Sequence, residues 1–317
     1  MLEYADFLNE FTERRRLSVF FSNGQTAEYG AQVGHVNVGK GNLSFVRKDL
    51  VTVGRVPLVL ARVYDSRLPP NSDFGQGWCL TAAETIHLDL EGNLTYRDDS
   101  ASSRLFVPDA EGTWVPAFGV ANGERIHRTT GGLFQVVLPN KIIKEFAFLD
   151  KSYRLTTVQD HNGNRLNLSY ENGRLTAIDN SNRKIVILRG KTGRIETVRD
   201  DSGREANYRY NARGLLKDSD DLGGHRWRYH YNKRNLLTHI IEPDGYHVLA
   251  AGYDEQGRAN EVLAGKAYSY SYRDNQTTVL DGNHPASYRT QPPSSQHSQA
   301  VPVTGLEPCQ LLLPANR

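Results

Sequence analysis

A short run of cationic and aromatic residues is the strongest candidate for ligand binding in this sequence. Arg226, Trp227, Arg228 and Tyr229 are consecutive, and Tyr231 follows two positions later. Guanidinium groups and aromatic rings stack on flat ligands, so the run could hold a sugar or a nucleobase. The alternative is that these side chains pack within a wall of repeated strands, because aromatic residues bury large apolar areas. We expect packing to be their first role.

Acidic residues occur in adjacent pairs, which is the wrong spacing for acid–base catalysis. Neighbouring side chains of a strand point to opposite faces, so two adjacent carboxylates cannot act on one substrate. Asp is also a preferred turn residue, and we therefore assign turn roles to these pairs. The pairs are Asp98-Asp99, Asp200-Asp201 and Asp220-Asp221.

Histidine and cysteine do not show the spacing of a metal site or of a nucleophile. His225 and His230 are five apart and would face opposite sides of one strand. His239 and His247 flank a turn and could approach each other, but no third ligand is evident. Cys79 has no neighbouring base in the sequence and is expected to be a small packed residue. We predict no metal, no cofactor and no enzymatic activity.

Composition excludes several other classes of function. The 317 residues carry 38 basic and 36 acidic side chains, so the net charge of +2 gives no general case for nucleic-acid binding. No apolar run approaches the ~20 residues that span a bilayer. The N-terminus lacks the basic start and apolar centre of a signal peptide, so export by that route is not expected.

A repeat of 20 or 21 residues organises the second half of the chain. Its leading apolar residues are Leu155, Leu175, Ile195, Leu216 and Leu237, with a weaker copy at Ala259. A period this short indicates stacked supersecondary units. An acid or an amide stands five residues after the leading residue of a unit, and a glycine stands eight residues after it. A tyrosine lies near the end of the unit. The members that define the pattern are Asp160, Asp200 and Asp221; Gly163, Gly203, Gly224 and Gly245; and Tyr170, Tyr210, Tyr231 and Tyr253.

This pattern predicts one β-hairpin in each unit. Asp-x-x-Gly supplies a side chain that bonds its own backbone and a residue that tolerates positive φ, as a hairpin turn requires. A single hairpin is marginal in water, so successive hairpins must pair edge to edge. The arms are polar, and we therefore expect a curved wall with one dry stripe and no solid apolar core.

The flanking regions have different compositions. Residues 34–150 hold short alternating runs such as "RVPLVLARVY" and "FQVVLP", which are typical of strands. Residues 1–33 are predicted to be a short amphipathic helix and a linker, with Arg14-Arg15-Arg16 and the helix available for docking a partner. Residues 283–317 are rich in proline and are predicted to be disordered. The hairpin repeats would occupy residues 151–282.

Two sets of motifs resemble those of a known family. The phrases "SYENGRLTAIDN" and "GYDEQGRANEV" are similar to the YD repeats of RHS proteins, Tc-toxin C components and teneurins. The upstream stretch resembles the domain that precedes RHS repeats in bacterial proteins. Its marks are Gly41-Asn42, Pro57-Leu58, the step Arg62-x-Tyr64-x-Ser66, and Phe74-Gly75-x-Gly77-Trp78.

The resemblance implies a spiral β-wall that encloses a C-terminal toxin in complete family members. We therefore expect a non-catalytic shell segment from the N-terminal part of such a toxin, truncated or displaced. Its partners would be the rest of the shell, a toxin domain and a secretion-system spike or adaptor, often of the type VI system used in bacterial competition. It would be cytoplasmic before delivery and then exported by a route without a signal peptide. The alternative is a carbohydrate-binding or adhesion module at the cell surface.

Overall fold

A computed structural model describes the backbone of residues 32–52, 58–70, 73–117, 124–273, 276–281, 284–290 and 300–302. Every regular element within these ranges is a β-strand, which confirms the predicted all-β class for this part of the chain. The predicted N-terminal helix, with Arg14-Arg15-Arg16, lies outside the described residues.

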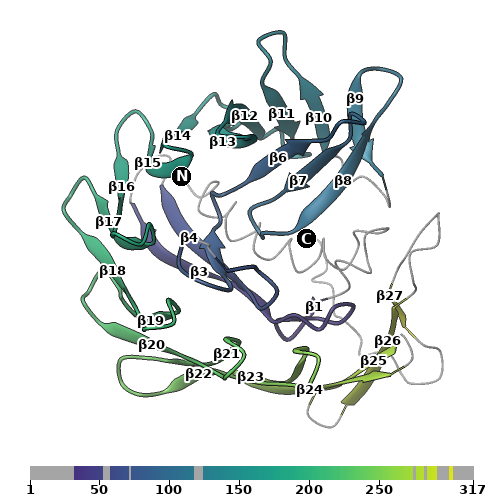
Figure 1. Cartoon of the computed structure of the whole chain (residues 1–317), viewed down its shortest axis with the longest axis vertical. Coiled ribbons are helices and arrows are strands. Elements are labelled where there is room, and N and C mark those ends of the chain that lie inside the picture. Colours follow the sequence, from purple (N-terminus) through teal and green to yellow (C-terminus); the bar gives the residue numbers. More distant parts are fainter. Residues whose placement is uncertain are drawn as a thin grey trace.

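A small three-stranded sheet, called here the central sheet, lies inside the curve of a much longer one (Figure 1). Its long hairpin pairs Ser44 with Asp65 and Val51 with Val59. A separate two-stranded hairpin precedes it. The strands of these two sheets are β1 (Gln32–Val33), β2 (Val36–Asn37), β3 (Ser44–Val51), β4 (Val59–Asp65) and β5 (Trp78–Leu80).

The long antiparallel sheet begins with eight strands that close on themselves, called here the ring. Each strand pairs with the next along the chain, and the ring closes where Tyr153 and Arg154 pair with Ile86 and Thr85. The strands of the ring are β6 (Thr85–Leu88), β7 (Leu94–Arg97), β8 (Ser103–Pro108), β9 (Thr113–Pro116), β10 (Arg125–Arg128), β11 (Phe134–Val137), β12 (Ile143–Leu149) and β13 (Ser152–Gln159).

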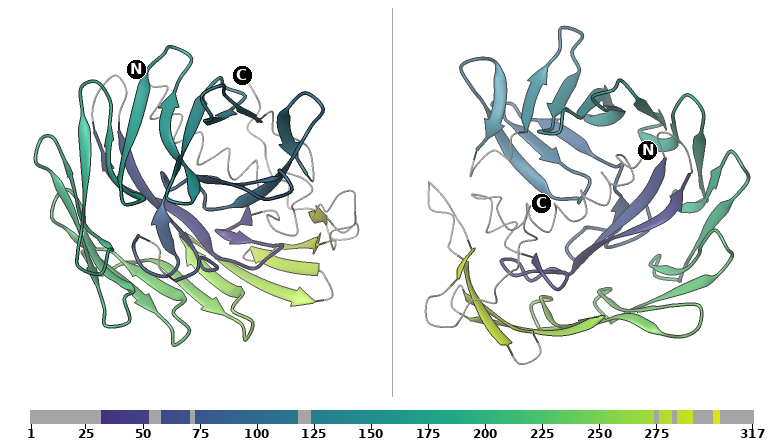
Figure 2. Two further views of the ribbon diagram at one scale, coloured as in Figure 1. Left: turned by 45° about the horizontal axis from the view of Figure 1, so that its top comes forward. Right: turned by 180° about the vertical axis from the view of Figure 1, so that it is seen from behind.

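The repeats continue the same sheet from β13 and curl around the central sheet, as both views of Figure 2 show. The later part of β13, Thr157–Gln159, pairs with β14, so β13 serves both the ring and this part, called here the repeat sheet. Its further strands are β14 (Arg165–Glu171), β15 (Arg174–Asp179), β16 (Lys184–Arg189), β17 (Ile195–Asp200), β18 (Glu205–Tyr210), β19 (Leu216–Asp220), β20 (Arg226–Tyr231), β21 (Leu237–Ile241), β22 (His247–Tyr253), β23 (Ala259–Ala264), β24 (Lys266–Arg273), β25 (Gln276–Asp281), β26 (His284–Thr290) and β27 (Ala300–Pro302).

A β-bulge recurs just after the leading residue of every unit. Ile195 pairs with Arg189 and Thr197 with Leu188, so Glu196 is the extra residue of its strand. The same shift occurs between β12 and β13, β14 and β15, β18 and β19, β20 and β21, and β22 and β23. A bulge bends its strand and increases the local twist. Repeated once in each unit, it gives the repeat sheet its curvature.

The inner face of the repeat sheet packs against the central sheet. One apolar cluster includes Leu60 and Trp78 from the central sheet and Ile195, Val198 and Leu216 from the repeats, each at most 1% exposed. The expectation of a wall without a solid apolar core is therefore wrong. The repeats supply only one apolar stripe each, but the upstream strands supply the opposing surface.

Part of the C-terminal tail also differs from the prediction of disorder. Residues 284–290 and 300–302 are strands β26 and β27, which pair with each other and extend the sheet from β25. Proline is tolerated at the margins of a sheet, and a sheet edge offers unpaired backbone groups that an added strand can satisfy. The other residues of the predicted tail from 291 onward lie outside the described ranges.

Candidate functional site

The repeated Asp and Gly build the turns at one rim of the repeat sheet. Asp160, Asp200 and Asp221 each accept hydrogen bonds on Oδ1 from the backbone N–H groups two and four residues on, at 2.9–3.0 Å. The glycine three residues after the turn acid or amide then adopts a φ of +79° to +94°. These glycines are Gly163, Gly203, Gly224 and Gly245.

The repeated tyrosines bind the backbone of the leading residue of their own unit. The hydroxyl of Tyr170 donates to the carbonyl of Leu155 at 2.7 Å, and that of Tyr210 to Ile195 at 2.5 Å. Tyr253 makes the same bond to Leu237 at 2.7 Å. Burial raises the pKa of all three tyrosines, so the hydroxyls remain protonated donors. Each tyrosine thus stabilises the backbone beside a bulge.

Tyr231 departs from this pattern because it serves the contact with the central sheet. Its hydroxyl accepts a hydrogen bond from Trp78 Nε1 at 3.0 Å. On β4, the strand before β5, the hydroxyl of Tyr64 accepts a bond from the backbone N–H of Leu237 at 2.9 Å. These bonds join residues more than 150 positions apart and hold the central sheet against the repeats.

Arg62 is the centre of the contact between the two sheets. Its side chain is 0% exposed and forms two bonds with Asp49, Nε to Oδ2 at 2.6 Å and Nη2 to Oδ1 at 3.1 Å. Nη2 also donates to Tyr229 at 2.7 Å and to Ser219 at 3.2 Å. Tyr208 completes the cluster by donating to Asp49 Oδ2 at 2.9 Å. We call these five residues the arginine latch.

The surroundings of the latch keep the guanidinium charged. Burial alone would lower the pKa of Arg62, but Asp49, Tyr229 and Tyr208 outweigh it and raise that pKa well above its ordinary value. The rings of Trp78 and Tyr208 lie 4.7 and 5.2 Å from the guanidinium carbon, within the range of cation–π attraction. The buried charge pair therefore joins β3 to β4, and its hydrogen bonds with the hydroxyls of Tyr208, Ser219 and Tyr229 join both strands to β18, β19 and β20.

Two glycines of the upstream motif permit this close approach. Gly75 has a φ of +91°, and a Cβ added there would lie 2.4 Å from the carbonyl oxygen of Gly214 in the repeat sheet. Gly77 has a φ of +83°, and an added Cβ would lie 2.5 Å from the ring of Tyr64. Because any side chain would force the backbone away, both positions favour glycine for sterics as well as for conformation.

The four residues predicted to bind a ligand do not share one surface. Tyr229 belongs to the latch and is 3% exposed, while Trp227 lies under Arg47, whose guanidinium carbon is 3.6 Å from the indole centroid. Arg226 and Arg228 are exposed on the other face of β20, and Arg226 bonds Asp220 at 2.9 Å. The aromatic and cationic members are thus separated by the thickness of the sheet, and the aromatic members face the central sheet.

The histidines and Cys79 do not assemble a reactive centre. The rings of His239 and His247 approach to 5.2 Å between centroids, and that of His230 lies 6.3 Å from His239. Across the described residues, no group of three or more His, Cys, Asp or Glu side chains is placed to hold a metal ion. Cys79 is buried, and burial raises the pKa of its thiol to about 11, so the nucleophilic thiolate is not formed near neutral pH.

A second buried charge pair lies at the closure of the ring. Lys144 Nζ is 2.7 Å from Glu84 Oε1, and the hydroxyl of Tyr96 donates to Glu84 Oε2 at 2.5 Å. Burial raises the pKa of Glu84 to about 7, and Asp99, which competes for the same ammonium group, adds to this effect. Glu84 therefore titrates near neutral pH.

The sequence contained a signal for the latch that composition and repeats do not reveal. Arg62 interrupts an apolar strand, and Arg62, Tyr64 and Trp78 are all marks of the upstream motif. The structure shows that these marks are the residues that contact the repeats. Asp49 and Tyr208 carried no such signal, because an acid in a short strand and a tyrosine in a repeat are common.

Two family models match this chain, one in its upstream part and one in its repeats. Residues 34–106 match a domain of unknown function, DUF6531, and residues 138–245 match the teneurin YD-shell. Over 88 residues, the chain is 38% identical to the tRNA nuclease WapA of Bacillus subtilis (strain 168) and to the tRNA3(Ser)-specific nuclease WapA of Bacillus spizizenii. The matched stretch is 27% of this chain and 4% of each relative.

Solved toxin structures show a looser similarity. A Tc holotoxin pore of Photorhabdus luminescens aligns with 78% of this chain at 11% identity and a TM-score of 0.33, covering 14% of that chain. The TcdB2-TccC3-TEV crystal structure aligns at 11% identity and a TM-score of 0.34, covering 78% of this chain and 16% of that one.

Within the described residues, no helix is long and apolar enough to cross a membrane.

The two family models match successive parts of the chain in the order that the upstream motif and the repeats predict. With the hairpin period of 20 or 21 residues, they identify this chain as a member of the RHS/YD-repeat family.

Proposed function

We propose that this chain is a non-catalytic shell segment of an RHS-type toxin or effector, which helps to enclose or present a C-terminal toxin. The observation that carries the proposal is the divided pairing of β13. Its first residues close the ring with β6, and its last residues begin the repeat sheet with β14. A closed ring covers one end of a container, while a sheet of hairpins can be extended by further repeats.

The central sheet gives this segment a second structural role. Through the arginine latch and the bonds of Tyr64 and Trp78, it lines the inner face of the repeat sheet between β18 and β21. A thin sheet with one apolar stripe needs such a partner to remain folded. We propose that the central sheet stabilises the curved wall from within, so that the wall keeps its shape around a cargo.

The relatives support a toxin as the cargo. The WapA proteins matched by this chain are named as tRNA nucleases, and the chain spans 4% of their length. We therefore propose that the toxic activity belongs to a separate domain, and that this chain contributes enclosure. The same proposal includes a secretion-system spike or adaptor as partner, delivery in bacterial competition, and export to the cell surface or medium by a non-Sec route.

Protection of a cargo from protease is the direct test. The chain would be co-expressed with the polypeptide encoded downstream of its reading frame, and the mixture purified and treated with trypsin. We expect the two to co-purify and the downstream polypeptide to resist cleavage, compared with the same polypeptide alone. If the two migrate separately on size exclusion and are cleaved at equal rates, the proposal of enclosure is wrong.

A further inference from the structure

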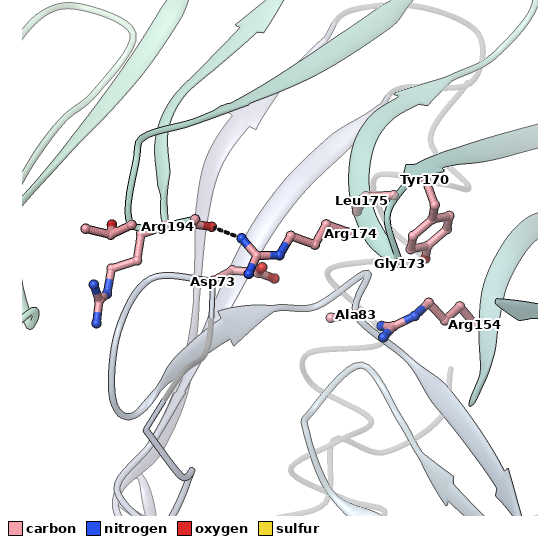
Figure 3. Close-up of a pocket in the computed structure, with 10 residues that line it drawn as sticks. Asp73, Ala83, Arg154, Tyr170, Gly173, Arg174, Leu175 and Arg194 are labelled. Carbon is pink, nitrogen blue, oxygen red and sulfur yellow. Dashed lines mark hydrogen bonds between the residues drawn. The ribbon is translucent and has the colours of Figure 1, made fainter. Parts of the chain in front are cut away.

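An arginine-lined pocket lies where the first repeat turns meet the loops around the central sheet. It has a volume of about 340 Å³. Arg154 of β13, Arg174 of β15 and Arg194 beside β17 line it, together with Tyr170, Asp73 and Ala83. Figure 3 shows Arg154 and Arg174 extending in the same direction from different strands: the guanidinium of Arg154 ends near Ala83, that of Arg174 ends near Asp73, and Arg194 extends away from both.

Arg154 and Arg174 form no ion pair with another described residue. Among the described residues, the guanidinium of Arg154 has no hydrogen-bond or ion-pair partner, and its Nε is buried without one. Arg174 donates from Nη1 to the carbonyl oxygen of Gly193 at 3.0 Å, which satisfies one donor but cancels no charge. A buried guanidinium donor without a hydrogen-bond partner is costly, so an acceptor brought within its reach would be bound favourably.

Few carboxylates lie near the pocket, and one of them is already paired with another arginine. Asp73 Oδ1 is 2.7 Å from Nη1 of Arg189, a fourth arginine next to the pocket. Asp150 lies against Gly173, where an added Cβ would be 2.4 Å from its Oδ2. Three arginines and one aspartate therefore line the pocket, although the whole chain has a net charge of only +2.

We propose that this pocket binds an anionic group, a phosphate or a carboxylate, held between Arg154 and Arg174. Guanidinium groups recognise both by charge-assisted hydrogen bonds, and a pair of them can grip one anion from two sides. Ala83 leaves room for the ligand, and the ring of Tyr170 provides an apolar side, because its hydroxyl is already bonded to Leu155. The volume suits a small molecule or the acidic side chain of a bound polypeptide.

Isothermal titration with inorganic phosphate and, separately, with acetate tests the proposal. We expect saturable binding of at least one of them, weakening as salt rises because screening reduces the attraction. Arg154→Gln removes one charge and retains most of the reach, and should raise the Kd about tenfold, or about 1.4 kcal/mol. Preferential binding of phosphate would identify a phosphorylated ligand, and preferential binding of acetate a carboxylate.

Two further variants make the result decisive. Ala83→Glu places a carboxylate between the arginines and should abolish binding of either anion while retaining the fold, as checked by circular dichroism. Arg165→Gln carries the same charge change on exposed Arg165, which bonds Gln159, and should bind as the unmodified chain does. The proposal is overturned if neither anion binds saturably, or if Arg154→Gln and Ala83→Glu bind as tightly as Arg165→Gln.

Discussion

Replacing Arg62 by methionine tests whether the latch holds the two sheets together. Methionine retains much of the length and the apolar stem of arginine but cannot donate hydrogen bonds. The change removes the two bonds to Asp49 and the bonds to Tyr229 and Ser219. Asp49, whose side chain is only 6% exposed, then loses its main partner.

The expected cost follows from this carboxylate, which retains only the more distant Arg47, 3.9 Å away, as a charged partner. Removing one partner of a buried ion pair typically destabilises a protein by about 3–5 kcal/mol. Attraction of the guanidinium to the ring of Trp78 is lost as well, which adds up to about 1 kcal/mol. The bond from Tyr208 to Asp49 remains and moderates the loss, so we expect about 3–5 kcal/mol in total.

Urea unfolding followed by tryptophan fluorescence measures this cost. With a slope of about 1–3 kcal/mol per molar, the midpoint should fall by about 1 M or more. The double variant Arg62→Met with Asp49→Asn should recover a large part of the loss, because it removes the buried charge. Arg228→Met is the matched control, since Arg228 is exposed on the outer face of β20 and should change stability by less than about 0.5 kcal/mol.

The reasoning would be refuted by a loss of less than about 1 kcal/mol, the scale of an exposed ion pair. It would also fail if the double variant were less stable than Arg62→Met, since the buried carboxylate would then not be the cause. Limited proteolysis gives an independent check. Loosening of the latch should expose β3 and β4 to cleavage before β14 to β22.

Three other substitutions examine the ring and the repeats. The pKa of Glu84 in the folded protein, about 7, is above its ordinary value of 4.5. The contribution of Glu84 to folding stability is therefore present below about pH 4.5 and is lost as the pH rises through 7. Glu84→Gln should flatten this pH dependence in urea midpoints measured from pH 4.5 to 8. Tyr210→Phe leaves the carbonyl of Ile195 without its donor and should cost about 1–2 kcal/mol in the same assay, whereas Tyr246→Phe on the exposed rim should cost almost nothing. Gly203 has a φ of +83° with open space around it, so Gly203→Ala should lower thermal stability by about 1–2 kcal/mol and Gly203→Asn by less; equal losses would contradict a purely conformational cause.

The hairpin repeats could be predicted because their information is local. Asp200 and Gly203 specify a turn through bonds within five residues, and Tyr210 binds Ile195 within the same unit. The period of 20 or 21 residues also indicates that neighbours pair edge to edge. What the period did not show is the bulge after each leading residue, since Glu196 looks like any other strand residue.

The partners of those residues across the fold could not be predicted. Tyr229 and Tyr231 have the same composition cues as the other repeat tyrosines, yet Tyr229 bonds Arg62 and Tyr231 bonds Trp78. The interpretation of Arg226 to Tyr229 as a stacking surface overlooked that alternate residues of β20 face opposite sides of a sheet already covered on one side.

By itself, the sequence determined the all-β class, the hairpin period, the turn chemistry and the motifs that resemble RHS proteins, because each of these depends on residues close together along the chain. Only the tertiary structure decided that the upstream strands fill the curve of the repeats, that β13 joins a closed ring to an open wall, and that Arg154 and Arg174 line one pocket. Those features depend on contacts between residues that are distant in sequence, and their energies arise from burial and charge at places that no local pattern specifies.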